Sequence, residues 1–480
     1  MKSKIARKQT IALAISVALA GGSFNAMADD DAIMAELMAL KQKIEQLERD
    51  LVASQEASKE ADEQISRDLV DSQEAAKTSD RVLFEGDSPS PTFVSSDGSK
   101  TMEIHGRAFI DFASMPDMYT YGKVGDMVES KTSTEFRKLY LGVEGNFAPN
   151  WEYELTIDFA EQAVDLKDAN VAYTGWANDE LIMGFQKPAF GLEQTSSSRY
   201  TMFMSRASTD NFSTDRALGV SWAHVPSWGS IKLGAFVPNS FIDGKLKDHT
   251  EGETEDGVEL IPSEASNEVE SYILTGRTTW APIASDNRLV HLGASGLYVG
   301  YDEPSTAKIK GRPSTHLAEK LVYAKVKDAD SQALLMAEGA FMYDNFYLQT
   351  EYVNVKVDAE EDYSFDGYYL SASWTLTGES RIYKKASGKF KGINPAHPLS
   401  MGGWGAWEVA ARYSNINLND GDVEGGNLTS MTLGLNWYME NNLRAMLNYV
   451  HYEADDYKDS SKYVISQDGN VIQGRLAFYF

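Results

Sequence analysis

The chain has 480 residues, a formal net charge of −27, 42% hydrophobic and 11% aromatic residues, and no cysteine. This apolar content excludes a wholly disordered protein. The absence of cysteine excludes disulfide scaffolds, thiolate metal sites and cysteine nucleophiles. An acidic chain also lacks the clustered Lys and Arg that a nucleic-acid backbone requires, so we expect no nucleic-acid partner.

Residues 1–28 have the pattern of a secretory signal peptide. Four basic residues between Lys2 and Lys8 precede an apolar run, Ile11 to Ala20, and Ala26-Met27-Ala28 forms a small-x-small cleavage site. No later stretch is apolar over the roughly 18 residues that a membrane helix needs. We therefore expect the mature chain either to be soluble outside the inner membrane or to cross a membrane as a barrel.

Residues 29–86 predict a helix that self-associates. Its apolar residues recur in alternating steps of four and three: Ile33, Leu37, Leu40, Ile44, Leu47 and Leu51. This heptad seam is typical of a coiled coil, whereas a helix packed on a domain carries a broader apolar stripe. Because a lone amphipathic helix is marginal in water, we expect a periplasmic α-helical coiled coil in a homo-oligomer. Residues 87–100, rich in serine and with two prolines, are expected to be a linker.

From residue 101 the apolar period changes to two. Between Trp151 and Ala160, apolar residues alternate with charged or small ones, and the segment before Phe480 repeats the pattern. Very short turns alternate with long connections, which is typical of an outer-membrane barrel, although a soluble antiparallel sandwich can also alternate. We expect an all-β transmembrane barrel of 16 antiparallel strands over residues 101–480. The expected strands start near residues 102, 134, 150, 165, 179, 217, 229, 269, 288, 331, 345, 364, 404, 426, 441 and 470.

Several motifs of this region, in this order, resemble the phosphate-selective porin O and P family. They are Phe136–Gly145, Asp165–Ala169, Gly184–Pro188, Phe190–Glu193, Ser198–Tyr200, Arg216–Val220, Gly402–Glu408 and Ala411–Tyr413. The resemblance implies a trimeric 16-stranded barrel whose third external loop folds into the lumen, and a channel lined by basic residues that pass anions. Matched to the family, the connection from Lys187 to Asp215 is the constriction loop.

Ten basic residues are candidates for lining the channel and binding anions. Those on the polar parity of a strand are Arg107, Lys138, Lys232, Arg277, Arg412, Arg444 and Arg475, and those in or directly after the constriction loop are Arg199, Arg206 and Arg216. A lipid-facing Arg or Lys costs about 2 to 4 kcal/mol at the bilayer midplane, so the strand residues are expected inside. Arginine suits phosphate because its planar fork gives bidentate contacts. The same parity also carries Glu144, Glu154 and Asp168, so a mixed wall with little ion preference stays open.

The expected function is passive diffusion of small inorganic anions, phosphate or polyphosphate, through an outer-membrane homotrimer surrounded by lipid and lipopolysaccharide. The alternatives are a general or weakly cation-selective porin, and a structural envelope protein anchored by its barrel and spaced by its coiled coil. No nucleophile elbow, zinc-protease motif or phosphate-binding glycine loop is present, so we expect no catalytic residues, metal or cofactor. The lysine-rich segment 377–403 is expected either to enter the lumen from the periplasmic side or to form a plain surface loop.

Overall fold

The computed structural model describes residues 30–77, 79–84, 89–115, 118–119, 127–128, 131–160, 164–237, 271–318, 320–458 and 464–480. The expected signal peptide, residues 1–28, lies outside the described residues. The chain divides into two compact units, Met1–Ser79 and Asp80–Phe480. Among the described residues, no helix is both long and apolar enough to cross a membrane.

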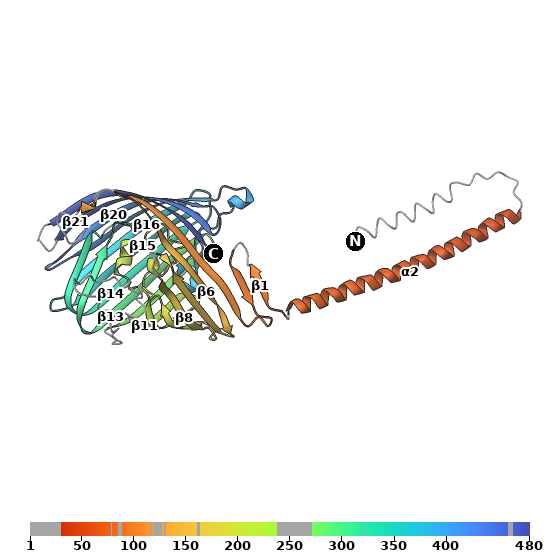
Figure 1. Cartoon of the computed structure of the whole chain (residues 1–480), viewed down its shortest axis with the longest axis horizontal. Coiled ribbons are helices and arrows are strands. Elements are labelled where there is room, and N and C mark those ends of the chain that lie inside the picture. The colour runs from red at the N-terminus through yellow and green to blue at the C-terminus, as the bar shows by residue number, and fades with distance from the viewer. Residues whose placement is uncertain are drawn as a thin grey trace, which may run out of the picture. The chain divides into compact units, whose positions relative to one another are not determined.

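The described part of the first unit is dominated by a long helix, α2 (Asp30–Lys77) (Figure 1). The segment has no proline or glycine and is rich in Ala, Glu, Leu, Lys and Gln, all strong helix formers. Its seam residues Leu37 and Leu47 are 58% and 63% exposed in the single chain. The helix is therefore present over most of the expected range, and the coiled coil stays a prediction.

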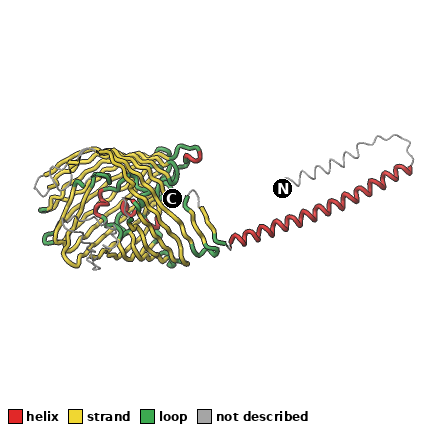
Figure 2. The backbone as a smooth tube through the Cα atoms, in the orientation of Figure 1, coloured by secondary structure: helices red, strands yellow, loops and turns green. Residues whose placement is uncertain are grey.

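Sixteen long strands form a closed antiparallel barrel, as predicted (Figures 1 and 2). Each pairs with its neighbours in chain order, and the last strand closes the ring on the first, with Leu476 opposite Ile110. The strands are β3 (Thr101–Met115), β6 (Lys131–Ala148), β7 (Trp151–Asp158), β8 (Asp165–Tyr173), β9 (Asp179–Gln186), β10 (Ala217–His224), β11 (Gly229–Val237), β12 (Ser271–Ala284), β13 (Arg288–Gly311), β14 (Val322–Tyr343), β15 (Phe346–Asp358), β16 (Tyr363–Thr375), β19 (Ala406–Asp420), β20 (Val423–Tyr438), β21 (Leu443–Lys458) and β22 (Val464–Tyr479).

The connections alternate between the two ends of the barrel. The turn end carries 149–150, 174–178, 225–228, 285–287, 344–345, 439–442 and the long segment 376–405, while the loop end carries the remaining connections, including 187–216 and 312–321. Most expected strand starts agree with the observed ones, but β14 and β22 start at Val322 and Val464, earlier than residues 331 and 470. Both early portions lie at the loop end, where strands that extend past the lipid need no apolar face.

Two short strands precede the barrel where a longer helix and a linker were expected. β1 (Arg81–Phe84) pairs with β2 (Pro91–Val94), and β2 pairs with the start of β3. The helix thus ends before residue 86, and part of the segment 87–100 is a strand. Pro91 is compatible with this strand because it occupies the first position.

Short elements complete the fold within the connections (Figure 2). They are β4 (Met118–Tyr119), β5 (Met127–Val128), α3 (Leu192–Thr195), η2 (Ser208–Phe212), β17 (Tyr383–Lys384), η3 (Lys385–Ser387), β18 (Lys389–Phe390) and η4 (Leu399–Met401).

The two faces of the barrel wall differ as the alternation predicts. On β3, Ile110 and Phe112 are each 45% exposed, whereas Asp111 between them is 4% exposed. Leu335 on β14 and Leu433 on β20 are also exposed. An apolar outer face is what a lipid-embedded barrel requires, and polar side chains are left to the interior.

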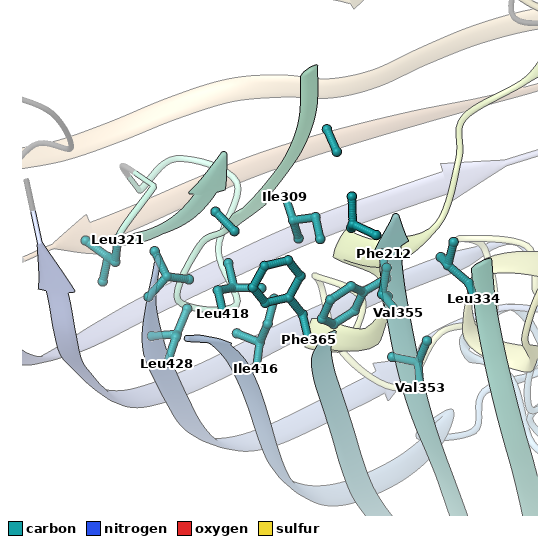
Figure 3. Packing of buried hydrophobic residues seen from close by; sticks show 14 of the residues in the cluster. Phe212, Ile309, Leu321, Leu334, Val353, Val355, Phe365, Ile416, Leu418 and Leu428 are labelled. Carbon is teal, nitrogen blue, oxygen red and sulfur yellow. The ribbon is translucent and has the colours of Figure 1, made fainter. Parts of the chain in front are cut away.

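One part of the interior is apolar, although the alternation predicts polar side chains on the inner face. Val353 and Val355 of β15 and Phe365 of β16 are at most 1% exposed and belong to a buried cluster with Phe212 from the 187–216 loop (Figure 3). The inner wall at the loop end is therefore packed by hydrophobic side chains, and burial of Phe212 holds the loop against that wall.

Candidate functional site

The 187–216 loop lies inside the barrel, where a buried carboxylate of the wall holds it. Glu351 of β15 accepts hydrogen bonds from the backbone N–H groups of Leu192 and Glu193, the first residues of α3, and from the Thr209 hydroxyl of η2 at 3.1 Å. Gly191, directly before α3, has a φ of 69°, and an added Cβ would come within 2.8 Å of a Glu351 oxygen. The positive φ and the close approach both favour glycine here.

Four arginines, which we call the arginine clasp, hold the middle of the loop by its backbone carbonyls. Each donates to at least one carbonyl between residues 200 and 205: Arg381 to Tyr200 at 3.1 Å, Arg444 to Thr201 at 2.8 Å and Met202 at 3.3 Å, Arg475 to Met204 at 2.8 Å, and Arg412 to Ser205 at 3.1 Å. The clasp fixes this stretch of the loop against the wall, and the side chains of Thr201, Met202, Phe203 and Met204 are themselves buried there.

The clasp arginines are also compensated by acidic side chains. Arg475 donates to both carboxylate oxygens of Asp111 at 2.6 Å, and Arg381 pairs with Glu408 at 2.5 Å. These pairs reduce the positive charge that the clasp presents to a solute, so its main effect is mechanical.

The turn-end segment 376–405 enters the lumen, which decides between the two expectations for it. Arg277 of β12 donates to the carbonyls of Ser387 at 3.1 Å and Gly388 at 2.9 Å, and it forms a buried ion pair with Glu338 of β14. Tyr383 contacts His291 of β13 through its hydroxyl at 2.8 Å. The segment thereby places three lysines, Lys384, Lys389 and Lys391, along the largest described cavity of the lumen, which we call the main cavity and which has a volume of about 1030 Å³.

The main cavity lies between the 187–216 loop, the turn-end segment and the wall. Thirteen Lys or Arg but only five Asp or Glu line it among the described residues. The basic residues are Arg107, Arg137, Lys138, Lys167, Lys187, Arg199, Arg206, Arg216, Lys232, Arg277, Lys384, Lys389 and Lys391, and the acidic ones are Glu144, Asp158, Glu180, Asp210 and Asp215. Its wall is thus strongly basic although the whole chain is acidic.

A smaller cavity of about 330 Å³ adjoins the loop on its other side. It shares Arg137, Lys138 and Arg206 with the main cavity and is lined by residues of the 312–321 connection at the loop end. Seven Lys or Arg and one Asp line it among the described residues. Both sides of the loop therefore present basic walls.

Several cations of the main cavity have no carboxylate of the described residues within ion-pair distance. Arg107 donates to the Ser198 hydroxyl at 3.0 Å and lies 4.7 Å from the Tyr140 ring centroid, and Arg199 lies 6.0 Å from the Tyr479 ring centroid. Lys187 donates to the Gln194 carbonyl at 3.1 Å. Uncompensated positive charge of this kind attracts anions more strongly than a paired wall does.

Burial affects the charge of two lysines that lie outside the strands of the wall. Burial, with the nearby Arg206 and Arg216, holds the pKa of the Lys187 amino group well below its ordinary value. Burial, with nearby Lys232 and Arg277, lowers the pKa of Lys389 to about 7. Lys389 therefore changes charge near neutral pH.

The comparisons with known proteins agree with this architecture. The model of the family described as phosphate-selective porin O and P matches residues 103–480. The chain belongs to this family. It is 24% identical over 422 residues to Porin O of Pseudomonas aeruginosa, which covers 80% of this chain and 90% of the relative. It is 29% identical over 370 residues to an uncharacterized protein of Caulobacter vibrioides, which covers 75% of this chain and 70% of the relative.

Solved structures of outer-membrane proteins give matches at lower identity. OmpT of Vibrio cholerae aligns over 83% of this chain and 100% of its own, at 10% identity and a TM-score of 0.48. The family and the closed barrel make the chain an outer-membrane porin, a channel rather than an enzyme.

Most of the residues predicted to line the channel do line one of the two cavities, but two of them do not. Arg107, Lys138, Arg199, Arg206, Arg216, Lys232 and Arg277 line the main cavity, and Arg475 lines the smaller one. Arg412 and Arg444 are 3% and 1% exposed and line neither cavity. The guanidinium groups of these two residues donate to backbone carbonyls of the loop, and their channel-lining role stays a prediction.

A β-bulge explains why alternation alone missed Arg137. The pairing of β3 with β6 shifts register, so that Phe109 lies opposite Lys138 and the next residue, Ile110, lies opposite Phe136. Phe136 and Leu139 are both exposed on the outer face, and the two basic residues between them both line the cavities. The bulge thus turns two consecutive cations inward.

Proposed function

We propose that this porin is anion-selective and passes phosphate-class oxyanions by diffusion past the 187–216 loop. The observation that carries the proposal is the excess of basic over acidic residues on both sides of the loop, thirteen to five and seven to one. The description of the family, phosphate-selective, and the named relative Porin O agree with this preference.

An anion entering from the loop end first meets the smaller basic cavity and then the cations on the loop itself. Arg199 offers a guanidinium without a carboxylate partner among the described residues, and the serines beside it offer hydroxyl donors. Several neighbouring sites of modest strength draw an anion in and still release it, as conduction requires.

The deciding experiment is the reversal potential of the purified porin in a planar bilayer under a KCl gradient, followed by phosphate titration of the chloride current. An anion-selective potential with block of the chloride current by phosphate is expected. Cation selectivity without block would contradict the proposal and favour the general or weakly cation-selective porin.

The helix supports a second proposal, that the porin is a homotrimer with a periplasmic coiled coil. The seam residues Leu40, Ile44 and Leu51 are between 47% and 58% exposed in the single chain, so association would bury them. In outer-membrane barrels the short turns face the periplasm, and this chain enters β3 from the turn end. The outer face of the barrel would contact lipid and lipopolysaccharide.

A further inference from the structure

One site on the lumen wall carries a histidine and two carboxylates, whereas the wall around it is basic. His105 of β3, Glu144 of β6 and Glu154 of β7 place one ligand atom each within 4.8 Å of one another. The three strands are consecutive in the barrel, and Glu144 lies directly opposite Glu154 across the β6–β7 pair. Two like charges directly opposite each other are destabilising, and a cation between them would remove this repulsion.

The wall provides a fixed place for the histidine ring. His105 is 5% exposed, and its Nε2 is 3.7 Å from a Glu144 oxygen and 3.5 Å from the Thr156 hydroxyl. Its cross-strand neighbour is Gly142, where a Cβ would lie 2.6 Å from the ring atoms Cε1 and Nε2. The absence of a side chain at residue 142 therefore lets the ring lie flat across the strand and direct Nε2 toward the carboxylates.

The carboxylates are not occupied by basic side chains. No Lys or Arg of the described residues lies within ion-pair distance of Glu144 or Glu154, and Glu154 accepts a hydrogen bond from the Thr156 hydroxyl at 3.4 Å. Glu144 is half exposed and lines the main cavity, so the site is open to solutes. It combines a buried imidazole, the exposed carboxylate of Glu144 and the partly buried carboxylate of Glu154.

We propose that His105, Glu144 and Glu154 bind a divalent transition-metal ion of the zinc type. One nitrogen and two carboxylate ligands are a set that zinc accepts, whereas calcium and magnesium prefer oxygen ligands alone. Zinc ligands at about 2.0 to 2.2 Å from the ion lie roughly 3.3 Å from each other in a tetrahedral site, so rotation of the two Glu side chains suffices to close the present spacing. The remaining position would face the cavity.

The bound ion would neutralise the local negative charge of the wall. Two carboxylates without a cation repel an anion, whereas a zinc ion neutralises them and offers an open coordination position to a passing oxyanion. This consequence for conduction rests on the proposed anion preference, but metal binding itself does not.

The test is zinc binding by isothermal titration calorimetry with the full-length porin, purified without a polyhistidine tag. We expect one site per chain that micromolar zinc fills and excess calcium does not displace. Glu144→Gln and His105→Gln should each weaken binding by at least about tenfold, since even the loss of an outer-shell partner has this effect. Glu144 is accessible, so its substitution leaves wall packing unchanged and keeps the test valid if His105→Gln fails to fold.

The matched control is His224→Gln. Among the described residues, this histidine lies within ion-pair distance of one carboxylate, that of Asp179 at 3.1 Å. The variant should bind zinc as the unchanged protein does. Equal affinity in Glu144→Gln, His105→Gln and the unchanged protein, or no binding at all, would overturn the site. The reversal potential measured without zinc tests the anion preference separately, so the two failures can be told apart.

Discussion

Arg216 donates to both carboxylate oxygens of Asp168, through Nε at 3.0 Å and Nη2 at 2.9 Å. Arg199, on the same loop, has no such partner among the described residues. The two arginines therefore differ in the charge they present to the lumen although both line the same cavity. Pairing, rather than position alone, decides how much an arginine contributes to anion selectivity.

This difference predicts the outcome of neutralising each arginine. Arg199→Gln removes an uncompensated charge and should shift the reversal potential toward cations. Arg216→Gln should shift it similarly, because it leaves Asp168 as an unpaired negative charge in the wall. The double variant Arg216→Gln with Asp168→Asn removes a neutral pair and should restore the original selectivity. A double variant that stays shifted would mean that Arg216 itself contacts the anion.

The arginine clasp predicts that the loop can be loosened without unfolding the barrel. Arg444→Met removes hydrogen bonds to the carbonyls of Thr201 and Met202, and a hydrogen bond to a charged group is worth about 1.5 to 3 kcal/mol. We expect faster proteolytic cleavage within residues 197–206 and noisier single-channel current, with the barrel still resistant to detergent.

The matched control for the clasp is Arg288→Met, because Arg288 lies near a short turn and stacks on Tyr343 at 5.0 Å from the ring centroid. It should leave both cleavage and current noise unchanged. Unchanged noise in Arg444→Met as well would show that the other three clasp arginines suffice.

The lowered pKa of Lys389 predicts that the anion selectivity of the channel depends on pH. Its pKa is lowered to about 7 by burial and by Lys232 and Arg277, so the amino group is charged below that pH and neutral above it. Anion selectivity should therefore increase as the pH falls from 8.5 to 6, a window of roughly one to two units around the pKa. Glu180 and Glu154 act on the same group in the opposite direction.

The reversal potential as a function of pH checks this expectation. Lys389→Met should remove most of the change in that window and resemble the unchanged protein at high pH. Lys391→Met, one residue beyond the neighbouring Phe390, is the control and should keep the pH dependence. If both variants keep it, another group titrates.

Much of the barrel could be predicted from sequence because apolar and polar residues alternate along each strand of its wall. Strand number, lipid-facing residues such as Leu476 and the loop that enters the lumen all follow from alternation, turn spacing and the family motifs. The role of Arg444 could not be predicted, because a basic residue on the inner parity looks the same whether it faces water or a backbone carbonyl. Arg137 was missed because a bulge shifts the parity locally, and Phe212 because apolar packing inside a porin has no periodic signal.

Removal of the helix distinguishes a channel from an envelope spacer. A deletion of residues 29–77 leaves β1 and β2 in place, so the pairing of β2 with β3 is kept. Single-channel conductance and selectivity should be unchanged, since neither cavity is lined by a described residue of this segment. The temperature at which the oligomer dissociates should fall, because the deletion removes the helices that would associate through their apolar seams. An oligomer of unchanged stability would instead mean that the helix binds another component of the envelope.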